Sequence, residues 1–346
     1  MKHQTTRYGE IPFYKIGTFG NTADAFISKK LFLEYKTKYS FPKKGDILIS
    51  ASGTIGRAVI YDGKPAYFQD SNIVWIDNDE TLVKNDFLFY AYSNVKWNTE
   101  HTTILRLYND NFRNTLIPLP PLNEQSAIAN ILSDLDRYLY ALDALILKKE
   151  SVKKALSFEL LSQRKRLKGF NQAWQRVRLG DIANYLTSNL SAEQITQQGK
   201  IKVYDVNNFI GYTDTTFISD KPYISIVKDG SVGRVRILPP KTNILSTMGA
   251  LIANHRTTTE FLFYLLSNFD FKNFTSGSII PHIYFKDYKE KTIFLPPLNE
   301  QSAIANILSG LDNEIASLKN KKRQFENIKK ALNHDLMSAK IRVLEK

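Results

Sequence analysis

The chain has 346 residues and a mass of 39.7 kDa, enough for two or three domains, with 43% hydrophobic and 23% charged residues. This composition excludes a disordered chain or a fibre, and the absence of cysteine excludes disulfides, zinc–thiolate sites and thiol nucleophiles. With no run of about 18 apolar residues and no charged-then-apolar leader at the start, we expect a soluble cytoplasmic protein without a membrane partner.

The formal net charge of +13 favours polyanionic partners such as nucleic acid. Counted by segment, residues 1–121, 122–168, 169–297 and 298–346 carry net charges of +3, +3, +4 and +3. The excess is therefore spread over the chain, which excludes a basic tail. A folded protein lying along a polyanion fits this distribution, and so does a basic globular protein that binds no nucleic acid.

Residues 1–121 have the pattern of an α+β lobe. β-Branched and aromatic residues between glycine, proline or aspartate predict strands, at Pro12–Ile16, Asp46–Ser50, Ala58–Tyr61 and Ile73–Ile76. A short helical pattern follows at Asn85–Tyr92. Residues 122–168 contain neither proline nor glycine and predict one long helix. Its apolar stripe consists of Ile128, Leu132, Leu135, Leu139, Leu142 and Ile146.

The same order recurs in the second half of the chain. Residues 169–297 predict a second α+β lobe, with strands at Lys202–Val206 and Tyr223–Val227 and a helix at Thr259–Leu266. Residues 298–346 predict a second long helix. Each long helix has about 40–45 residues, or roughly 60–65 Å. The second apolar stripe consists of Ile304, Leu308, Leu311, Ile315, Leu318 and Phe325.

An internal duplication explains this order. The fifteen residues from Leu119 to Ser133 recur without change from Leu295 to Ser309, an offset of 176 residues. A weaker echo relates the Gly-Thr-Ile-Gly-Arg segment 53–57 to the Gly-Ser-Val-Gly-Arg segment 230–234. The chain is therefore a tandem repeat of one lobe followed by one helix.

The repeated segment predicts how each helix begins and what it packs against. The two prolines should end the preceding strand, and Asn123 and Asn299 are plausible N-caps. A long helix with one apolar stripe needs a partner, and the other copy is the simplest one, which predicts an antiparallel coiled coil. Alternatively, each helix caps its own lobe. Lysines on the stripe indicate an imperfect pairing or a face turned toward another protein, namely Lys153, Lys322 and Lys329.

No catalytic or metal-binding motif is present. A strand–GxGxxG–helix unit and a GxxxxGK[ST] loop are both missing, and the five histidines lack metal-ligand spacing. The segment Asp229–Arg234 lacks the lysine of a phosphate loop and reads as a tight turn between two strands. We therefore expect a chain without catalytic activity of its own and without a bound cofactor or metal.

The two Leu-Pro-Pro-Leu-Asn-Glu-Gln helix starts, each following a lobe with a Gly-[Ser/Thr]-[Ile/Val]-Gly-Arg turn, resemble the specificity subunit of type I restriction–modification systems. The resemblance extends over essentially the full chain. It implies two target recognition domains that each read half of a bipartite DNA site, with paired helices as the spacer. It also implies modification subunits, two in number, that bind S-adenosylmethionine and methylate adenine, and restriction subunits that use ATP and magnesium.

Candidate DNA-contacting residues are basic and hydroxyl side chains expected on loops, because directional hydrogen bonds read base edges and positive charge binds phosphates. Each also has a simpler interpretation as a surface residue, or as one that stabilises its own turn. In the first lobe they are Lys43, Lys44, Ser52, Thr54, Arg57 and Arg106. In the second they are Lys228, Ser231, Arg234, Arg256 and His282, with Arg106 and His282 at matching positions.

The first lobe departs from the pattern. The second opens with Trp174–Ile182, about 20 residues before its first strand at Ile201–Tyr204, whereas the similar strand of the first lobe starts at Pro12. The first lobe is either naturally shorter or lacks its start. Two further functions also stay open: a scaffold that joins proteins through its coiled coil, and a silent specificity allele that supplies lobes by recombination.

Overall fold

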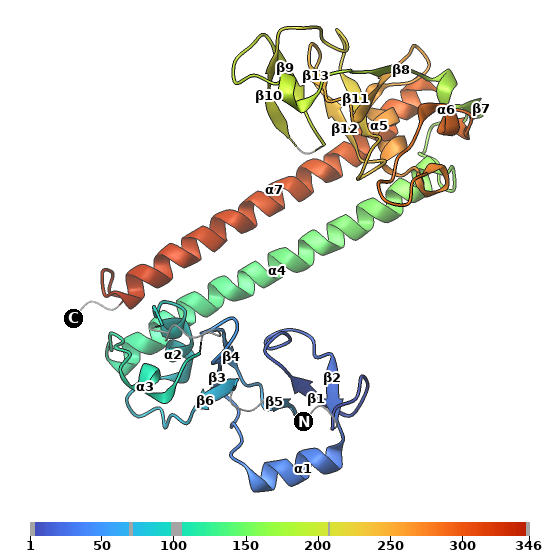
Figure 1. Cartoon of the computed structure of the whole chain (residues 1–346). Coiled ribbons are helices and arrows are strands. Elements are labelled where there is room, and N and C mark those ends of the chain that lie inside the picture. Colours follow the sequence, from blue (N-terminus) through green and yellow to red (C-terminus); the bar gives the residue numbers. More distant parts are fainter. Residues whose placement is uncertain (1–3, 69–71, 98–105, 207, 344–346) are drawn as a thin grey trace. The chain divides into compact units, whose positions relative to one another are not determined.

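The computed structural model describes residues 4–68, 72–97, 106–206 and 208–343. The chain forms two compact units. Unit 1 joins Met1–Asp143 to Asn320–Lys346, and unit 2 is Ala144–Lys319. Each unit therefore contains one lobe, the first half of the helix that follows it and the second half of the other long helix (Figure 1). No helix among the described residues has the length and apolarity needed to cross a membrane.

Lobe 1, residues 4–121, has two three-stranded sheets with strand orders β2-β1-β5 and β4-β3-β6. Its strands are β1 (Ile11–Tyr14), β2 (Ala25–Ile27), β3 (Ile47–Ser50), β4 (Ala58–Ile60), β5 (Tyr67–Phe68) and β6 (Ile73–Ile76). Its helices are α1 (Lys29–Lys38), α2 (Asn85–Tyr92) and α3 (Asn109–Arg113). Strand β3 is buried along its whole length, which places the core of the lobe between this sheet and α2.

Lobe 2, residues 169–297, repeats both sheets and adds three strands. Its sheets have the orders β10-β9-β13, β12-β11-β14-β8 and β15-β7. The strands are β7 (Gln175–Arg178), β8 (Ala183–Thr187), β9 (Ile201–Tyr204), β10 (Phe209–Thr213), β11 (Tyr223–Val227), β12 (Val235–Leu238), β13 (Asn243–Ile244), β14 (Met248–Ala253) and β15 (Thr292–Leu295). The helices are α5 (Thr259–Ser267) and α6 (Phe285–Tyr288), with short 3-10 turns at Leu179–Asp181, Ala192–Gln194 and Lys272–Phe274.

The two lobes share one topology. In each, a central strand has an antiparallel neighbour on one side and a short parallel neighbour on the other, which equates β1 with β9. Likewise β3 and β11 each lie between two antiparallel partners. Strands β7, β8 and β15 of lobe 2 have no counterpart among the described residues of lobe 1. The mixed α/β character expected for both halves is confirmed.

The long helices are α4 (Leu122–Leu161) and α7 (Leu298–Met337), each with 40 residues. Both start two residues earlier than N-caps at Asn123 and Asn299 would place them, because the carbonyls of Pro121 and Pro297 already accept the amides of Gln125 and Gln301 at 2.9 Å. Asn123 therefore lies inside the first turn, where its side chain accepts the amide of Glu124 at 2.9 Å. Asn299 has the same place in α7.

The helices pack antiparallel within each unit. In unit 1, Asp143 pairs with Lys322 at 2.7 Å, and Asp136 pairs with Lys329 further along. In unit 2, Asp312 pairs with Lys153. The three lysines that seemed out of place on the apolar stripe each bind an aspartate of the opposite helix at the edge of the seam. This pairing removes the reason for expecting an imperfect coiled coil.

Every residue of the two predicted apolar stripes is buried or half-buried. Leu132 and Leu308 are fully buried, and each also contacts the core of its own lobe. The repeat is not perfect at the seam. In unit 1 the rings of Tyr138 and Phe325 contact each other at a tilt of 53°, and they occupy the positions that the ion pair of Lys149 and Glu314 takes in unit 2.

Candidate nucleic-acid interface

A buried glutamine fastens each lobe to the start of its long helix. The side-chain oxygen of Gln301 accepts the amide of Thr258 at 3.0 Å, and its nitrogen donates to the carbonyls of Arg256 and Pro296 at 2.9 and 2.8 Å. Gln125 makes the matching contacts in unit 1, to the amide of Lys84 and the carbonyls of Leu82 and Pro120. The first turn of the helix therefore fixes the loop before α2 or α5.

A tyrosine, an aspartate and a lysine form a second repeated contact. The hydroxyl of Tyr264 on α5 donates to Asp312, which also binds Lys153. Burial, and then the hydrogen bond to Asp312, raise the pKa of Tyr264, so the tyrosine remains a donor at neutral pH. In unit 1, Tyr90, Asp136 and Lys329 repeat this arrangement, with lysine and aspartate at the offset of 176.

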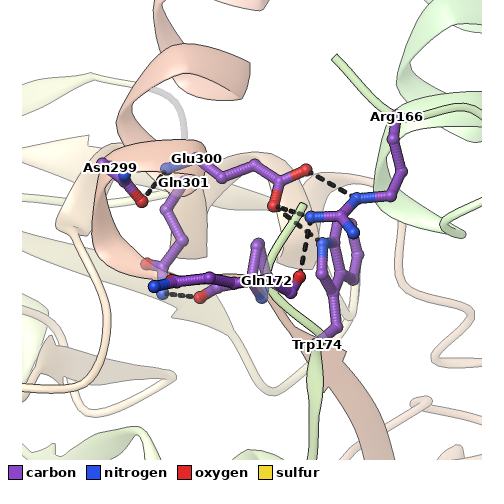
Figure 2. Close-up of polar contacts among 7 residues, drawn as sticks. Arg166, Gln172, Trp174, Asn299, Glu300 and Gln301 are labelled. Carbon is purple, nitrogen blue, oxygen red and sulfur yellow. Dashed lines mark hydrogen bonds and ion pairs between the residues drawn. The ribbon is translucent and has the colours of Figure 1, made fainter. Parts of the chain in front are cut away.

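A buried glutamate binds the chain that leaves the opposite helix. Figure 2 shows Glu300, whose side chain is fully buried, accepting from the guanidinium of Arg166 and, at 3.0 Å, from the indole of Trp174. Glu124 binds Arg342 in the same way, and this arginine lowers the pKa of the carboxyl. Arg166 and Arg342 are again 176 residues apart.

The two glycine turns have the same backbone geometry. Gly56 and Gly233 both have φ of +79°, which only glycine adopts without strain. A Cβ on Gly233 would also lie 2.6 Å from the ring of Phe271, and one on Gly56 would overlap Trp97. Each turn is closed by the glycine amide, which donates to a carbonyl six residues earlier at 2.9–3.0 Å. The weak sequence echo therefore marks a real structural repeat.

A third segment crosses each turn at the same place. The backbone of Arg106 forms an isolated antiparallel β-bridge with Ser52 beside the first turn, and the backbone of His282 forms one with Asp229 beside the second. In lobe 2 the amide of Gly230 donates to the carbonyl of Pro281 at 2.8 Å, which joins the turn to the loop at Ser276–His282. The apex of this loop is apolar and exposed, with Ile279 92% and Ile280 61% accessible.

The structure brings some of the predicted DNA-contacting residues together and separates others. Ser52, Thr54, Arg57 and Arg106 surround the turn of lobe 1, and Lys228, Ser231, Arg234 and His282 surround the turn of lobe 2. Lys43 and Lys44 instead precede β3, where Lys43 pairs with Asp77 at 3.2 Å. Arg256 is half-buried beside the start of α7 and donates to Gln175.

Three of the candidates that surround the glycine turns already have polar partners within the protein. Ser52 is 2% exposed and its hydroxyl donates to Asn72 at 2.7 Å. Arg57 donates to the carbonyl of Phe19 at 2.9 Å. The ring nitrogen of His282 lies 3.2 Å from the carbonyl of Ile280. Arg234 is exposed, and its side chain makes no hydrogen bond or ion pair with the described residues, which leaves its guanidinium available for a ligand.

Two matches to one protein family cover most of the chain. The model of the type I restriction modification DNA specificity domain matches residues 1–150 and again 171–327. The chain belongs to this family. The two matches correspond to the two repeats found in the sequence, so the chain carries two specificity domains.

Two curated relatives are similar to different lengths of the chain. A putative type I restriction enzyme specificity subunit of Haemophilus influenzae is 65% identical over 133 residues, which are 38% of this chain and only 34% of that protein. The putative type I restriction enzyme MjaX specificity subunit of Methanocaldococcus jannaschii is 29% identical over an alignment 335 residues long, which covers 86% of this chain and 79% of that one. The crystal structure of an S subunit from M. genitalium has the same fold, with a TM-score of 0.63 at 21% identity, over 97% of this chain and 91% of that one.

The two short helices predicted after the strands of each lobe are also similar in sequence, which was not part of the predicted repeat. Residues 87–94 read Phe-Leu-Phe-Tyr-Ala-Tyr-Ser-Asn and residues 261–268 read Phe-Leu-Phe-Tyr-Leu-Leu-Ser-Asn. These segments form most of α2 and α5 and carry the tyrosines that bind Asp136 and Asp312. The repeat therefore includes the helix that joins each lobe to the paired long helices.

Proposed function

We propose that the chain is a specificity subunit that reads a bipartite DNA target, with one half-site for each lobe. The observation that carries this proposal is the contrast between a repeated frame and lobes that differ. The frame comprises the long helices, α2 or α5, and the buried glutamine, glutamate and tyrosine contacts. Outside this frame and the glycine turn, the lobes share little sequence, which suits two half-sites of different sequence.

We propose that the frame also binds the partner subunits. A surface that occurs twice in one chain suits two copies of one partner, as two modification subunits would be. These subunits would supply S-adenosylmethionine and methylate adenine, and restriction subunits would supply ATP, magnesium and cleavage. The chain itself would stay non-catalytic and would hold no cofactor. A change in the sequence of the lobes would then alter the DNA specificity of the complex and no other property of it.

DNA binding across a range of salt concentrations tests the proposal. We expect the complex of this chain with its modification subunits to bind duplex DNA with an affinity that falls steeply with salt, because each phosphate contact contributes a slope of about −0.9 in log K against log salt. A flat response would contradict DNA recognition and favour a coiled-coil scaffold for proteins.

A matched pair of variants localises the contact. Arg234→Gln removes the exposed charge beside the turn of lobe 2, and we expect the salt slope to become shallower by about one unit. Arg176→Gln removes an exposed arginine of β7, which pairs with β15 and lies outside both the frame and the turn, and should leave the slope unchanged. Equal slopes for the two variants would remove the turn of lobe 2 from the interface.

A further inference from the structure

The most exposed large apolar side chains of lobe 2 lie together on one loop. Among the described residues of this lobe, Ile279 is 92% exposed and Ile280 is 61% exposed, and the next most exposed is Phe294 at 50%. Neighbouring apolar side chains that face water indicate a surface with a partner, whereas single ones need no explanation. The loop that carries them, Ser276–His282, crosses the glycine turn of the same lobe.

The base of this loop is closed by hydrogen bonds in both directions. The amide of Ser276 donates to the carbonyl of His282 at 2.9 Å, and the amide of His282 donates to the carbonyl of Ser276 at 2.8 Å. Gly277 has a φ of +90°, and a Cβ on it would lie 2.3 Å from the carbonyl oxygen of Ile280. Only glycine allows this close approach, so the chain reverses within a few residues and places the two isoleucines at the apex.

The core of the lobe and the glycine turn hold the loop in place. Ile283, the residue after the loop, is buried in the core, and its amide donates to the carbonyl of Lys228 at 2.9 Å. The carbonyl of Pro281 accepts the amide of Gly230 at 2.8 Å. A loop that is ordered before it binds loses less conformational entropy on binding, so this apex is suited to contact a ligand.

The surroundings of the apex favour a polyanion. The loop has no acidic side chain, and the serines Ser276 and Ser278 are exposed. The adjoining turn ends at Arg234, whose exposed guanidinium makes no hydrogen bond or ion pair with the described residues. Within residues 228–234, Asp229 is the one acidic residue, against the two positive charges of Lys228 and Arg234. An apolar tip beside an available arginine fits DNA, because base edges offer apolar contacts and the flanking phosphates bind cations.

The sequence of the loop differs between the lobes, although the turn beside it is repeated. Residues 276–282 read Ser-Gly-Ser-Ile-Ile-Pro-His, whereas residues 100–106, at the offset of 176, read Glu-His-Thr-Thr-Ile-Leu-Arg. Residues 100–105 lie outside the described part of the chain. The two sequences share only the isoleucines at positions 280 and 104. A variable loop next to a constant turn suits an element that selects one half-site.

We propose that Ile279 and Ile280 form an apolar finger that contacts the bases of the half-site read by lobe 2, beside a phosphate bound by Arg234. This inference rests on the proposed function and extends it to two specificity-determining residues. Isoleucine has no hydrogen-bonding group in its side chain, so it recognises the apolar parts of a base pair, namely a base face at an opened step or the methyl group of thymine. The finger therefore adds affinity for particular bases without adding to the salt dependence.

Variants of Ile279 test the finger in the complex of the full chain with its modification subunits. The probes are a duplex with the motif that this complex methylates and a duplex of the same base composition in scrambled order. Ile279→Ser should weaken binding to the motif at least about tenfold, because burial of a whole isoleucine side chain contributes a factor of this size. Binding to the scrambled duplex should weaken less, and the salt slope should stay the same because no charge is removed. Ile279→Val keeps most of the apolar surface and should retain most of the affinity.

Leu186→Ser is the matched control. Leu186 on β8 is 43% exposed and lies on the opposite face of the sheet from Tyr185, whose ring stacks on Phe285 just after the loop. This variant should bind both duplexes as the parent chain does. Equal losses for the two serine variants, or no loss for Ile279→Ser, would overturn the proposal. Release of the modification subunits by Ile279→Ser in size-exclusion chromatography would also overturn it, because the loop would then bind protein.

Two modified duplexes identify the part of the base that the finger contacts. If the contact is with a base face, 2-aminopurine at that step should brighten when the parent complex binds and stay dark with Ile279→Ser. If the contact is with a methyl group, replacement of that thymine by deoxyuridine should weaken binding of the parent complex but not of Ile279→Ser. Either result supports the finger, and failure of both at every position of the half-site would overturn it. Absence of DNA binding by the parent complex would refute the proposed function as well, whereas the other contrary results refute the finger alone.

Discussion

Replacement of Gln301 by methionine tests the frame at its most enclosed polar residue. The Gln301 side chain is fully buried and makes four hydrogen bonds at 2.8–3.0 Å. Methionine has a similar length but cannot make these bonds. At about 1 kcal/mol for each net hydrogen bond, the variant should lose about 4 kcal/mol of unfolding free energy. Gln125→Met removes three bonds and should cost about 3 kcal/mol.

Urea unfolding followed by circular dichroism measures these losses, and hydrogen exchange locates them. Gln301→Met should accelerate exchange in residues 144–319, and Gln125→Met in residues 1–143 and 320–343, because each glutamine acts within its own unit. Gln324→Met, on the exposed face of α7, is the control and should change neither quantity. A loss below about 1 kcal/mol for Gln301→Met, or equal acceleration in both units, would refute the reasoning.

Three further perturbations follow from the same contacts. Leu308→Ala, at a fully buried position of the helix seam, should cost about 2–5 kcal/mol in urea unfolding, and the half-exposed neighbour Ile307→Ala less than about 1 kcal/mol; equal costs would contradict the predicted seam. Burial raises the pKa of Tyr223 to about 12, so the stability that this protonated tyrosine contributes should be complete below pH 10 and decline as pH rises toward 12. Tyr223→Phe should lessen this decline in a series of melting temperatures measured at alkaline pH. Because Arg342 lowers the pKa of Glu124, the stability that this ion pair adds to the folded state should be complete above about pH 4.5 and lost at lower pH. Arg342→Gln should raise the pKa of the Glu124 carboxyl measured by NMR, and an unchanged pKa would exclude the pairing.

The duplication made much of the architecture predictable. An exact repeat of fifteen residues fixed two equivalent helix starts, and the apolar spacing identified the residues that the helices bury. The glycine echo was short, but it corresponded to a real turn because positive φ and close contact with Phe271 or Trp97 leave no room for another residue. Patterns of this kind depend on local geometry, which the sequence encodes directly.

Contacts between distant segments were less accessible. Lys153 and Lys329 seemed unfavourable on the apolar stripe, because only the register of the antiparallel pair places an aspartate opposite each of them. The buried role of Ser52 could not be foreseen either, since its hydrogen bond goes to Asn72 across the sheet. Leu119 and Leu295 lie in identical sequence, yet Leu295 is buried and Leu119 is half-exposed, because the strand of Leu295 pairs with β7.

The most direct test of the central claim is a map of methylated adenines in DNA treated with this chain, its modification subunits and S-adenosylmethionine. Two different lobes on a repeated frame predict one gapped motif with two unlike halves. Exchange of lobe 2 for that of another specificity subunit should change one half and leave the other intact. Methylation without this chain, or a motif that changes in both halves after the exchange, would contradict the account.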